Sequence, residues 1–321
     1  MKWYPIKFTP ILQEKIWGGT KLNSFFNKPS TLDNIGESWE ISAVKNNISV
    51  VANGSLKGKT LQELLENLKD KLVGKSVYEV FKNEFPLLIK FIDANDDLSV
   101  QLHPNDILAK KRHDSFGKTE MWYIMHADKG SRLILGFKDG VTKATYETAL
   151  QDKKLLETLN EVPVKKGDTY FLPTGTVHAI GSGILLAEVQ QTSDVTYRVY
   201  DWDRVDENGN ERDLHVAEAL EAINFDYKGE KSNYKIKTGE SVPMVNCNYF
   251  TTNILALTKK KRMEYAHIDS FVIYMCVSGS AKLVGLDFKV EIKMGETVLI
   301  PAALNDFIIK TKGVKLLEVF I

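Results

Sequence analysis

Polar side chains that could bind a ligand are concentrated between residues 172 and 204. His178, Glu188, Gln190, Asp194 and Arg198 lie there at mostly even separations. On an extended backbone, residues at even separations point to the same side of the strand. A strand face that carries an imidazole, two carboxylates, an amide and a guanidinium is costly to bury unless these groups bind something. This segment therefore predicts a ligand site rather than part of an apolar core.

A second set of residues offers the donor atoms of a metal site. Gln101 and His103 are two residues apart at the end of a predicted strand, Glu120 opens a later strand, and His178 follows a Pro-Thr-Gly turn. Two imidazoles, a carboxylate and an amide oxygen suit zinc and, less selectively, other divalent ions. Each histidine could instead be a satisfied interior or surface residue, and we prefer that interpretation for His113, His126, His215 and His267.

The composition shows no strong charge bias. The 321 residues suffice for two or three domains or one large one, 43% are hydrophobic, and 42 Lys and Arg balance 42 Asp and Glu. Nothing in this balance indicates a nucleic acid or an anionic membrane as partner. Residues 1–8 lack the apolar run of a signal peptide, and no stretch is long enough to span a bilayer. We expect a cytoplasmic protein that is a monomer or a weak homo-oligomer.

Short strands interrupted by helices must position these side chains. Leucines at spacings of three and four predict a helix within residues 56–85, with Thr60 as N-cap and a break at Gly74. A second helical insertion is predicted over residues 143–159, and a short helix over 213–224 with Asp213 as N-cap. Strands are predicted over residues 86–93, 98–103, 120–125, 132–136, 162–164 and 169–172, and from about residue 235 to the end.

One strand-and-turn pattern occurs twice. Residues 164–173 match residues 292–301, and each copy has Gly followed by Asp or Glu and then, after four intervening residues, Pro. Each copy leads into a strand that ends in Glu-Val, at Glu188 and Glu318. This turn pattern is typical of a cupin, a small jelly-roll barrel. We therefore predict a mainly β protein with two cupin barrels and α-helical insertions, divided into residues 1–234 and 235–321.

The two copies differ at the residues that could bind a metal. Five residues after Pro173 stands His178, whereas Asp306 follows Pro301 at the same distance. Aligning the Gly-Ser pairs at 130 and 279 places Asp269 opposite Glu120. We expect the first barrel to hold the metal and the second to be a degenerate copy that contributes packing.

Four motifs in order resemble those of the type I mannose-6-phosphate isomerases, also called phosphomannose isomerases, most closely in their short bacterial form. They are Gln-Leu-His-Pro at 101–104, Gly-Lys-Thr-Glu-Met-Trp at 117–122, Pro-Thr-Gly-Thr-Val-His-Ala at 173–179, and the run from Gln190 to Arg204. The resemblance extends over the whole chain. It implies an enzyme with one Zn²⁺ per chain that interconverts mannose 6-phosphate and fructose 6-phosphate, both small sugar phosphates.

The resemblance also implies roles for individual residues. The metal ligands of the family fall on Gln101, His103, Glu120 and His178. The catalytic arginine falls on Arg198, a lysine before the metal carboxylate on Lys118, and an acidic residue on Asp194. Positions that resemble the lining of the sugar pocket are Trp17, Glu37 and Glu188. The longer family members have a larger helical elaboration, so residues located there have no counterpart in this chain.

The chemistry of such an isomerisation calls for the same types of group. Moving a proton between C1 and C2 of a sugar passes through an enediolate, whose charge a zinc ion stabilises as a Lewis acid. A metal-bound water, Asp194, Lys118 or His103 could carry the proton, and the sequence does not choose among them. The substrate phosphate needs a local cationic clamp, for which Arg198 and Lys118 are the candidates. Ser99 could donate a further hydrogen bond.

Two other functions remain open at the level of sequence. A metal-cupin oxygenase would usually need three histidines or a two-histidine facial triad, and would leave Lys118 and Arg198 without an obvious role. A non-catalytic sugar-binding or regulatory cupin would bind sugar without turnover and would not need a metal set together with a proton-transfer set. Turnover, iron content and oxygen uptake separate these functions.

Overall fold

The computed structural model describes residues 2–28, 32, 34–205, 208–227 and 229–321. Two sheets form the N-terminal part. One has the order β1 (Ile11–Gly19), β2 (Ile35–Ile41), β5 (Leu87–Ala94), β12 (Ile184–Gln191), β7 (Glu120–Ala127), β10 (Thr169–Leu172) and β14 (Glu230–Lys231). The other has the order β13 (Tyr197–Tyr200), β6 (Val100–Leu102), β11 (His178–Ile180), β8 (Arg132–Phe137) and β9 (Leu159–Pro163).

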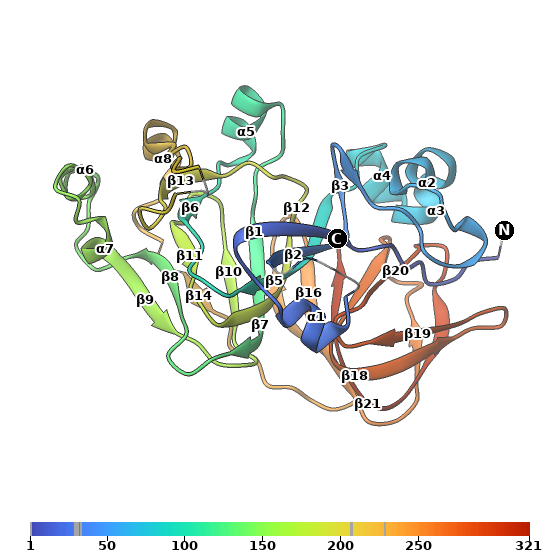
Figure 1. The fold of residues 1–321 in the computed structure, drawn as a ribbon. Helices are drawn as coiled ribbons and strands as arrows, with labels where there is room; N and C mark the ends of the chain where they lie inside the picture. The colour runs from blue at the N-terminus through green and yellow to red at the C-terminus, as the bar shows by residue number, and fades with distance from the viewer. Residues whose placement is uncertain (1, 29–31, 33, 206–207, 228) are drawn as a thin grey trace.

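A third sheet forms the C-terminal part, drawn in orange and red beside the N-terminal strands (Figure 1). Its strands run in the order β15 (Ser241–Asn246), β16 (Thr251–Leu257), β21 (Asp306–Phe320), β18 (Val272–Val284) and β19 (Lys289–Lys293). In addition, β17 (Lys261–Glu264) pairs with β21 and β20 (Thr297–Ile300) pairs with β18, while β3 (Ala43–Val44) and β4 (Asn47–Ile48) form a separate ribbon. The prediction of a mainly β protein is confirmed.

The central strands of the N-terminal sheet are buried on both faces. In β5, Ile89 and Phe91 belong to the large apolar cluster that also contains residues of the C-terminal sheet, such as Ile273 and Leu317. The alternate residue Ile92 belongs to another cluster, inside the N-terminal part. Because successive residues of a strand point to opposite faces, this sheet covers the C-terminal sheet on one side and encloses the interior of the N-terminal part on the other. Polar residues on the interior face are therefore exceptions that need partners.

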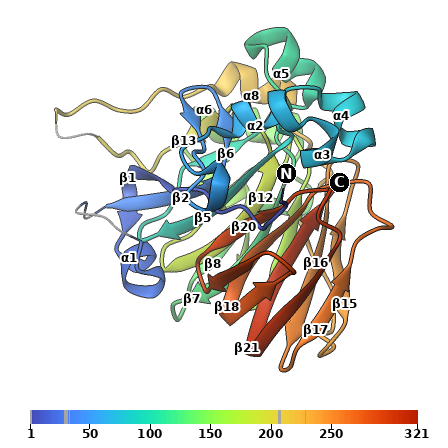
Figure 2. The same cartoon turned by 90° about the vertical axis from the view of Figure 1, so that its right-hand side faces the viewer.

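Helices join and cover these strands, with α2 to α4 on one side of the molecule (Figure 2). The segment 56–85, where a helix was predicted, forms α2 (Leu61–Leu68), α3 (Asp70–Val73) and α4 (Lys75–Phe81), after the 3-10 helix η1 (Gly54–Leu56). Thr60 caps α2 as predicted, and the chain breaks at Gly74, whose φ of +93° suits glycine. The insertion at 143–159 forms α6 (Lys143–Gln151) and α7 (Leu155–Thr158).

The remaining helices differ from the prediction. Asp213 is not the N-cap of the helix expected over 213–224, because α8 spans Val216–Ala222 and His215 precedes it. The backbone N–H of His215 donates to the carbonyl oxygen of Arg198, which attaches this residue to β13. The helices α1 (Lys21–Phe26) and α5 (Asp106–His113) were not predicted, because neither carries an apolar stripe long enough to mark a helix. Among the described residues, no helix is long and apolar enough to cross a membrane.

Strand pairing corrects the alignment of the two repeats. Leu172 of β10 pairs with Glu120 of β7, and the matching residue of β20, Ile300, pairs with Val272 of β18. Val272 therefore occupies the position of Glu120, and the expectation for Asp269 is wrong by three residues. The carboxylate of Asp269 instead accepts hydrogen bonds from backbone N–H groups at the start of α4.

Candidate metal centre

Three predicted ligands come together inside the N-terminal part. The ligand atoms of His103, Glu120 and His178 all lie within 4.8 Å of one another, and each side chain is at most 2% exposed. Nε2 of His103 is 3.5 Å from one oxygen of Glu120, and Nε2 of His178 is 3.4 Å from the other. The carboxylate thus lies between two imidazoles that come from the opposite sheet.

Strand ends and register position these side chains. Glu120 is the first residue of β7, His178 is the first residue of β11, and His103 follows directly after β6. His178 pairs with Gln101 of β6, which in turn pairs with Arg198 of β13. Residues opposite one another on antiparallel strands project to the same face, about 5 Å apart. Gln101 therefore lies beside His178, and its Oε1 accepts a hydrogen bond from Oγ of the buried Ser99 at 3.1 Å.

Backbone carbonyls orient both imidazole rings. Nδ1 of His103 donates to the carbonyl oxygen of Val195 at 2.8 Å, and Nδ1 of His178 donates to that of Thr176 at 2.9 Å. In this assigned tautomer each Nε2 carries a lone pair that points toward Glu120. Burial lowers the pKa of His178 to about 3, and burial together with Lys118 holds the pKa of His103 well below its usual value. Both rings are thus neutral at neutral pH, as metal ligands must be.

The acceptors of this cluster fit a cation. Both oxygens of Glu120 and Nε2 of His178 are buried without a hydrogen bond within the described part of the chain, and only Oε2 of Glu120 has an ion pair with a cation, Lys118. Burial raises the pKa of Glu120 to about 7, although Lys118 opposes this shift. Buried acceptors without partners are rare and costly in native proteins. Two imidazoles and a carboxylate would satisfy their lone pairs by binding a borderline ion such as zinc.

Lys118 brings a buried ammonium to the same place. Its Nζ is 3.0 Å from Nε2 of His103 and 3.3 Å from Oε2 of Glu120. Lys118 therefore contacts two of the three candidate ligands. Because an ammonium is a strong donor, it holds the neutral ring of His103 and the carboxylate in one arrangement.

A second group of buried charges lines the same interior. Nζ of Lys90 is 3.2 Å from Oε2 of Glu188 and 3.8 Å from Oε2 of Glu37. The indoles of Trp122 and Trp39 donate to Glu188 and Glu37 at 2.8 and 2.6 Å. Burial would raise the pKa of Glu37, but Lys90 and Lys15 outweigh it and lower this pKa. The predicted pocket residues Glu37 and Glu188 therefore meet through a lysine.

Sequence reasoning missed Lys90. This lysine is the single cation in the otherwise apolar strand of residues 87–92. A buried cation needs an anionic partner, so its position could have indicated a buried ion pair. Gln190 is one of the polar residues of the segment predicted to bind a ligand. It pairs with Glu120, and its Oε1 is buried without a partner among the described residues. The third predicted pocket residue, Trp17, packs in the apolar cluster that also contains Ile92 and Trp122.

Arg198 lies at the edge of this interior. Its NH1 donates to the carbonyl oxygen of Asp213 at 2.9 Å, while its Nε is buried and has no partner in the described structure. Arg204 and Arg212 both bind the carboxylate of Asp201, each with one nitrogen at 2.6 Å. Burial and the nearby Arg212 lower the pKa of Arg198. Three guanidinium groups thus lie near one another at this edge, together with the carboxylates of Asp201 and Asp213, and sequence reasoning did not find this group.

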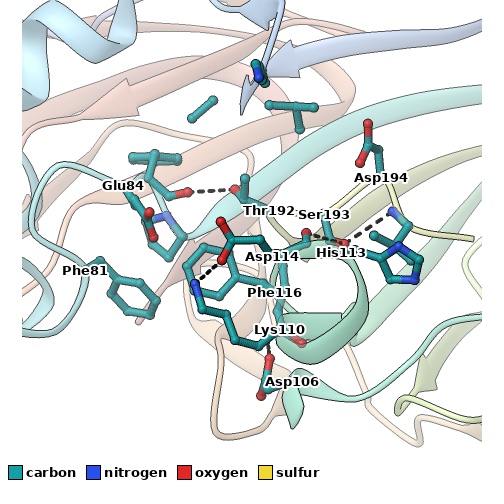
Figure 3. Close-up of a pocket in the computed structure, with 18 of the residues that line it drawn as sticks. Phe81, Glu84, Asp106, Lys110, His113, Asp114, Phe116, Thr192, Ser193 and Asp194 are labelled. Atoms are coloured by element: carbon teal, nitrogen blue, oxygen red, sulfur yellow. Dashed lines mark hydrogen bonds and ion pairs between the residues drawn. The ribbon is translucent and has the colours of Figure 1, made fainter. Parts of the chain in front are cut away.

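Asp194 lies apart from the triad. A regular strand would place it on the same face as Arg198, but β13 begins only at Tyr197 and the Asp194 side chain is exposed. Figure 3 shows it on the wall of an outer pocket of about 960 Å³, together with Ser193 and His113. The alternation rule fails here because residues 192–196 are not in a strand.

Comparison with known proteins identifies the family. Residues 6–130 match the family model of the catalytic domain of type I phosphomannose isomerase, and residues 240–320 match that of the mannose-6-phosphate isomerase cupin domain. Mannose-6-phosphate isomerase ManA of Bacillus subtilis is 37% identical over 94% of this chain and 95% of its own length. The mannose-6-phosphate isomerase of Streptococcus mutans is 33% identical over 94% of both chains.

Solved structures agree with this comparison. The crystal structure of mannose 6-phosphate isomerase from Bacillus subtilis superposes with a TM-score of 0.90 at 34% identity, covering 99% of both chains. A phosphomannose isomerase variant from Salmonella typhimurium shares the fold with a TM-score of 0.78 at 18% identity. The chain therefore has the cupin-type fold of these enzymes and belongs to the type I mannose-6-phosphate isomerase family.

Proposed function

We propose that the protein is a zinc-dependent aldose-ketose isomerase that interconverts mannose 6-phosphate and fructose 6-phosphate through an enediolate. The observation that supports this most directly is the buried triad of His103, Glu120 and His178, which has unpartnered acceptors and has Lys118 in contact. The relatives that match nearly the whole chain carry this activity in their names.

The metal ligands that we propose are the triad and the amide oxygen of Gln101, which lies beside His178 in register. A bound zinc ion would supply Lewis-acid stabilisation of negative charge on the substrate oxygens. The protein would supply neutral imidazoles, oriented by the carbonyls of Val195 and Thr176. Such outer hydrogen bonds keep ligand rings in place and preserve affinity for the ion.

Recognition of the phosphate would fall to Arg198, because Lys118 contacts the proposed metal ligands and the hydroxyl of Ser99 already donates to Gln101. The buried Nε of Arg198 is free to donate, and a planar guanidinium suits a phosphate better than a point charge does. Arg204 and Arg212 add positive charge nearby, while their bonds to Asp201 hold them in place. A dianionic group would therefore find complementary charge at this edge of a protein that has no net charge.

Proton transfer between C1 and C2 would fall to Lys118. Its Nζ lies 3.0 Å from Nε2 of His103, so it lies beside a proposed metal ligand, as an acid or base near the reacting carbons must. We place Asp194 at the rim of the site, since its side chain is exposed. Trp17, Glu37 and Glu188 would line the sugar pocket, with Lys90 paired to the two carboxylates.

We also propose that the chain consists of two cupin barrels, residues 1–234 and 235–321, and that the second is a degenerate copy. The matching strand pairs support this: β10 and β12 flank β7, and β20 and β21 flank β18. Glu188 pairs with Trp122 in the first set, and Glu318 pairs with Tyr274 in the second. The position of His178 is taken by the exposed Asp306, which forms an ion pair with Arg262.

A coupled assay tests the proposed function. Fructose 6-phosphate formation from mannose 6-phosphate is measured for the purified protein, after treatment with a chelator, and after return of zinc or iron. We expect turnover that is lost with the chelator and restored by zinc. A protein that binds one zinc ion and mannose 6-phosphate without turnover would be a sugar-binding module, and the isomerase proposal would be wrong.

A further inference from the structure

Lys118 is held from both sides through its backbone. The N–H of Gly117 donates to Oδ1 of Asp106 at 2.8 Å, and the N–H of Thr119 donates to Oε1 of Gln191 at 2.9 Å. These two side chains also bind each other, because Nε2 of Gln191 donates to Oδ1 of Asp106 at 3.0 Å. The backbone on either side of Lys118 is thus attached to one connected pair of side chains.

The fit between Gly117 and the start of α5 is tight. A Cβ atom on Gly117 would lie 2.7 Å from the backbone nitrogen of Asp106 and 2.9 Å from its Oδ1. No side chain fits at that distance, so glycine allows the segment that carries Lys118 and Glu120 to approach the helix. Gln191, the last residue of β12, faces this helix, whereas its neighbour Gln190 faces the metal ligands.

The same carboxylate is bound from the C-terminal part of the chain. The hydroxyl of Tyr249, in the turn between β15 and β16, donates to Oδ2 of Asp106 at 2.6 Å. Burial and the Asp106 carboxylate raise the pKa of Tyr249 to about 12, so the phenol remains a donor at neutral pH. Asp106, Gln191 and Tyr249 all line the outer pocket, where Figure 3 shows Asp106 beneath Lys110.

We infer that Asp106 is a positioning residue which, with Gln191 and Tyr249, fixes Lys118 and Glu120 relative to His103. This inference rests on the proposed function, because it assigns Asp106 a part in that same site. It also gives the C-terminal part a second contribution besides packing. A displacement of about 1 Å at a reacting group can cost about a hundredfold in rate, so loosening this attachment is expected to cost on the order of tenfold.

The central test compares two substitutions at the start of α5. Asp106→Ala removes the attachment, whereas Asn105→Ala removes the helix N-cap, whose Oδ1 accepts from the N–H of Leu108 at 3.0 Å. We expect kcat of Asp106→Ala to fall about tenfold with KM changed less than about threefold. Asn105→Ala should keep kcat within about twofold even though loss of the cap lowers stability. Asp106→Asn retains the Oδ1 acceptor and should restore most of the lost kcat.

A double-mutant cycle tests whether Tyr249 acts through Asp106. Tyr249→Phe removes one hydroxyl, and we expect a fall in kcat of about threefold in the parent and no further fall in the Asp106→Ala background. If Asp106→Ala does not fold, Gln191→Met and Tyr249→Phe decide the question by the same measurements. Values of kcat within about 1.5-fold of the parent for both would overturn the inference.

Zinc affinity, measured by competition with a chelator, separates this inference from the proposed function. Loss of a hydrogen bond to a metal ligand typically lowers metal affinity 10- to 100-fold. Asp106 instead holds the segment that leads to Glu120, so we expect the low end of this range, about tenfold, for Asp106→Ala with Asn105→Ala unchanged. If the parent binds zinc but does not isomerise the sugar phosphate, the proposed function fails and the affinities alone test Asp106. Equal losses in Asn105→Ala and Asp106→Ala, or none in either, would show that Asp106 only stabilises the helix.

Discussion

Nε2 of His178 lies 3.4 Å from Oε1 of Glu120, and neither atom has a hydrogen-bond partner in the described structure. Two buried acceptors in contact repel each other unless a cation or a proton lies between them. We therefore expect His178→Ala to fold, to bind zinc at least about a hundredfold more weakly and to lose turnover. Substitution of a residue that only hydrogen-bonds to a metal ligand already lowers metal affinity 10- to 100-fold, so loss of a ligand should cost at least as much. Elemental analysis after dialysis checks this, and a full equivalent of retained zinc would contradict the ligand assignment.

The pKa of Glu120 predicts how the metal-free protein responds to pH. Its folded-state pKa is raised from 4.5 to about 7. The stabilisation by the protonated carboxyl is therefore complete below pH 4.5 and is lost as the pH rises through about 7, on the order of 3 kcal/mol in all. Glu120→Gln cannot ionise and should exceed the parent in stability above pH 7.

Chelator-treated parent and Glu120→Gln are compared by denaturant unfolding at several pH values between 5 and 9. The same variant should have lost its zinc site, so the substitution stabilises the empty protein at the expense of metal binding. The histidines shift stability in the opposite direction below pH 6.5, because the unfolded chain binds protons that buried His178 does not. A stability difference between parent and variant that does not change with pH would show that Glu120 is not the titrating group.

Arg198→Ala tests the proposed phosphate clamp. If the guanidinium meets the substrate in this half-buried position, its loss should cost about 3 kcal/mol or more of transition-state stabilisation, roughly a hundredfold in kcat/KM. Arg198→Lys keeps the charge without the planar fork and should recover only part of the loss. Both variants should retain zinc. A kcat/KM for Arg198→Ala within threefold of the parent would remove Arg198 from the site.

Lys90→Met tests the buried charges beside the sugar pocket. Glu188 and Glu37 would lose the ammonium that lies 3.2 and 3.8 Å from their oxygens. Breaking a buried ion pair by removing one partner typically costs about 3–5 kcal/mol, so the free energy of unfolding should fall by that order. Adding Glu188→Gln to Lys90→Met should return part of it. Full stability in Lys90→Met alone would mean that water or another cation already screens these carboxylates.

Asp306→Ala provides a comparison in the C-terminal part. Its carboxylate is exposed and pairs with Arg262, and exposed pairs contribute little to stability. The thermal midpoint should shift by about 2 °C or less, and zinc content and turnover per folded molecule should match the parent. Loss of zinc in this variant would mean that the metal site lies in the C-terminal part and that our assignment to the N-terminal part is wrong.

Local sequence patterns were sufficient for several features of this molecule. The cap at Thr60 and the break at Gly74 depend on a few consecutive residues, and both were predicted. The cluster of His103, Glu120 and His178 was predicted because the motifs that contain these residues are short runs of consecutive residues. Wherever the chain is regular, alternation along a strand gives the face of each side chain.

Other features depend on which distant segments pair. In the second repeat, strand register makes Val272, rather than Asp269, the residue equivalent to Glu120. The late start of β13 leaves the side chain of Asp194 exposed. Neither could be obtained from spacing alone, because register is set by burial of one face against a partner strand that the sequence does not name.

For the buried charges, too, the sequence indicates that a partner is needed and the tertiary structure decides which residue it is. A lysine within an apolar strand indicates that an anionic partner is needed, but only the tertiary structure shows that the partners of Lys90 are Glu188 and Glu37, from strands on either side of β5. Likewise, Tyr249 reaches Asp106 across 143 positions of the chain. The spacing of apolar residues along one helix or strand can be seen in consecutive residues. Contacts between distant residues, such as that of Tyr249 with Asp106, form only after the apolar faces of separate sheets have packed together.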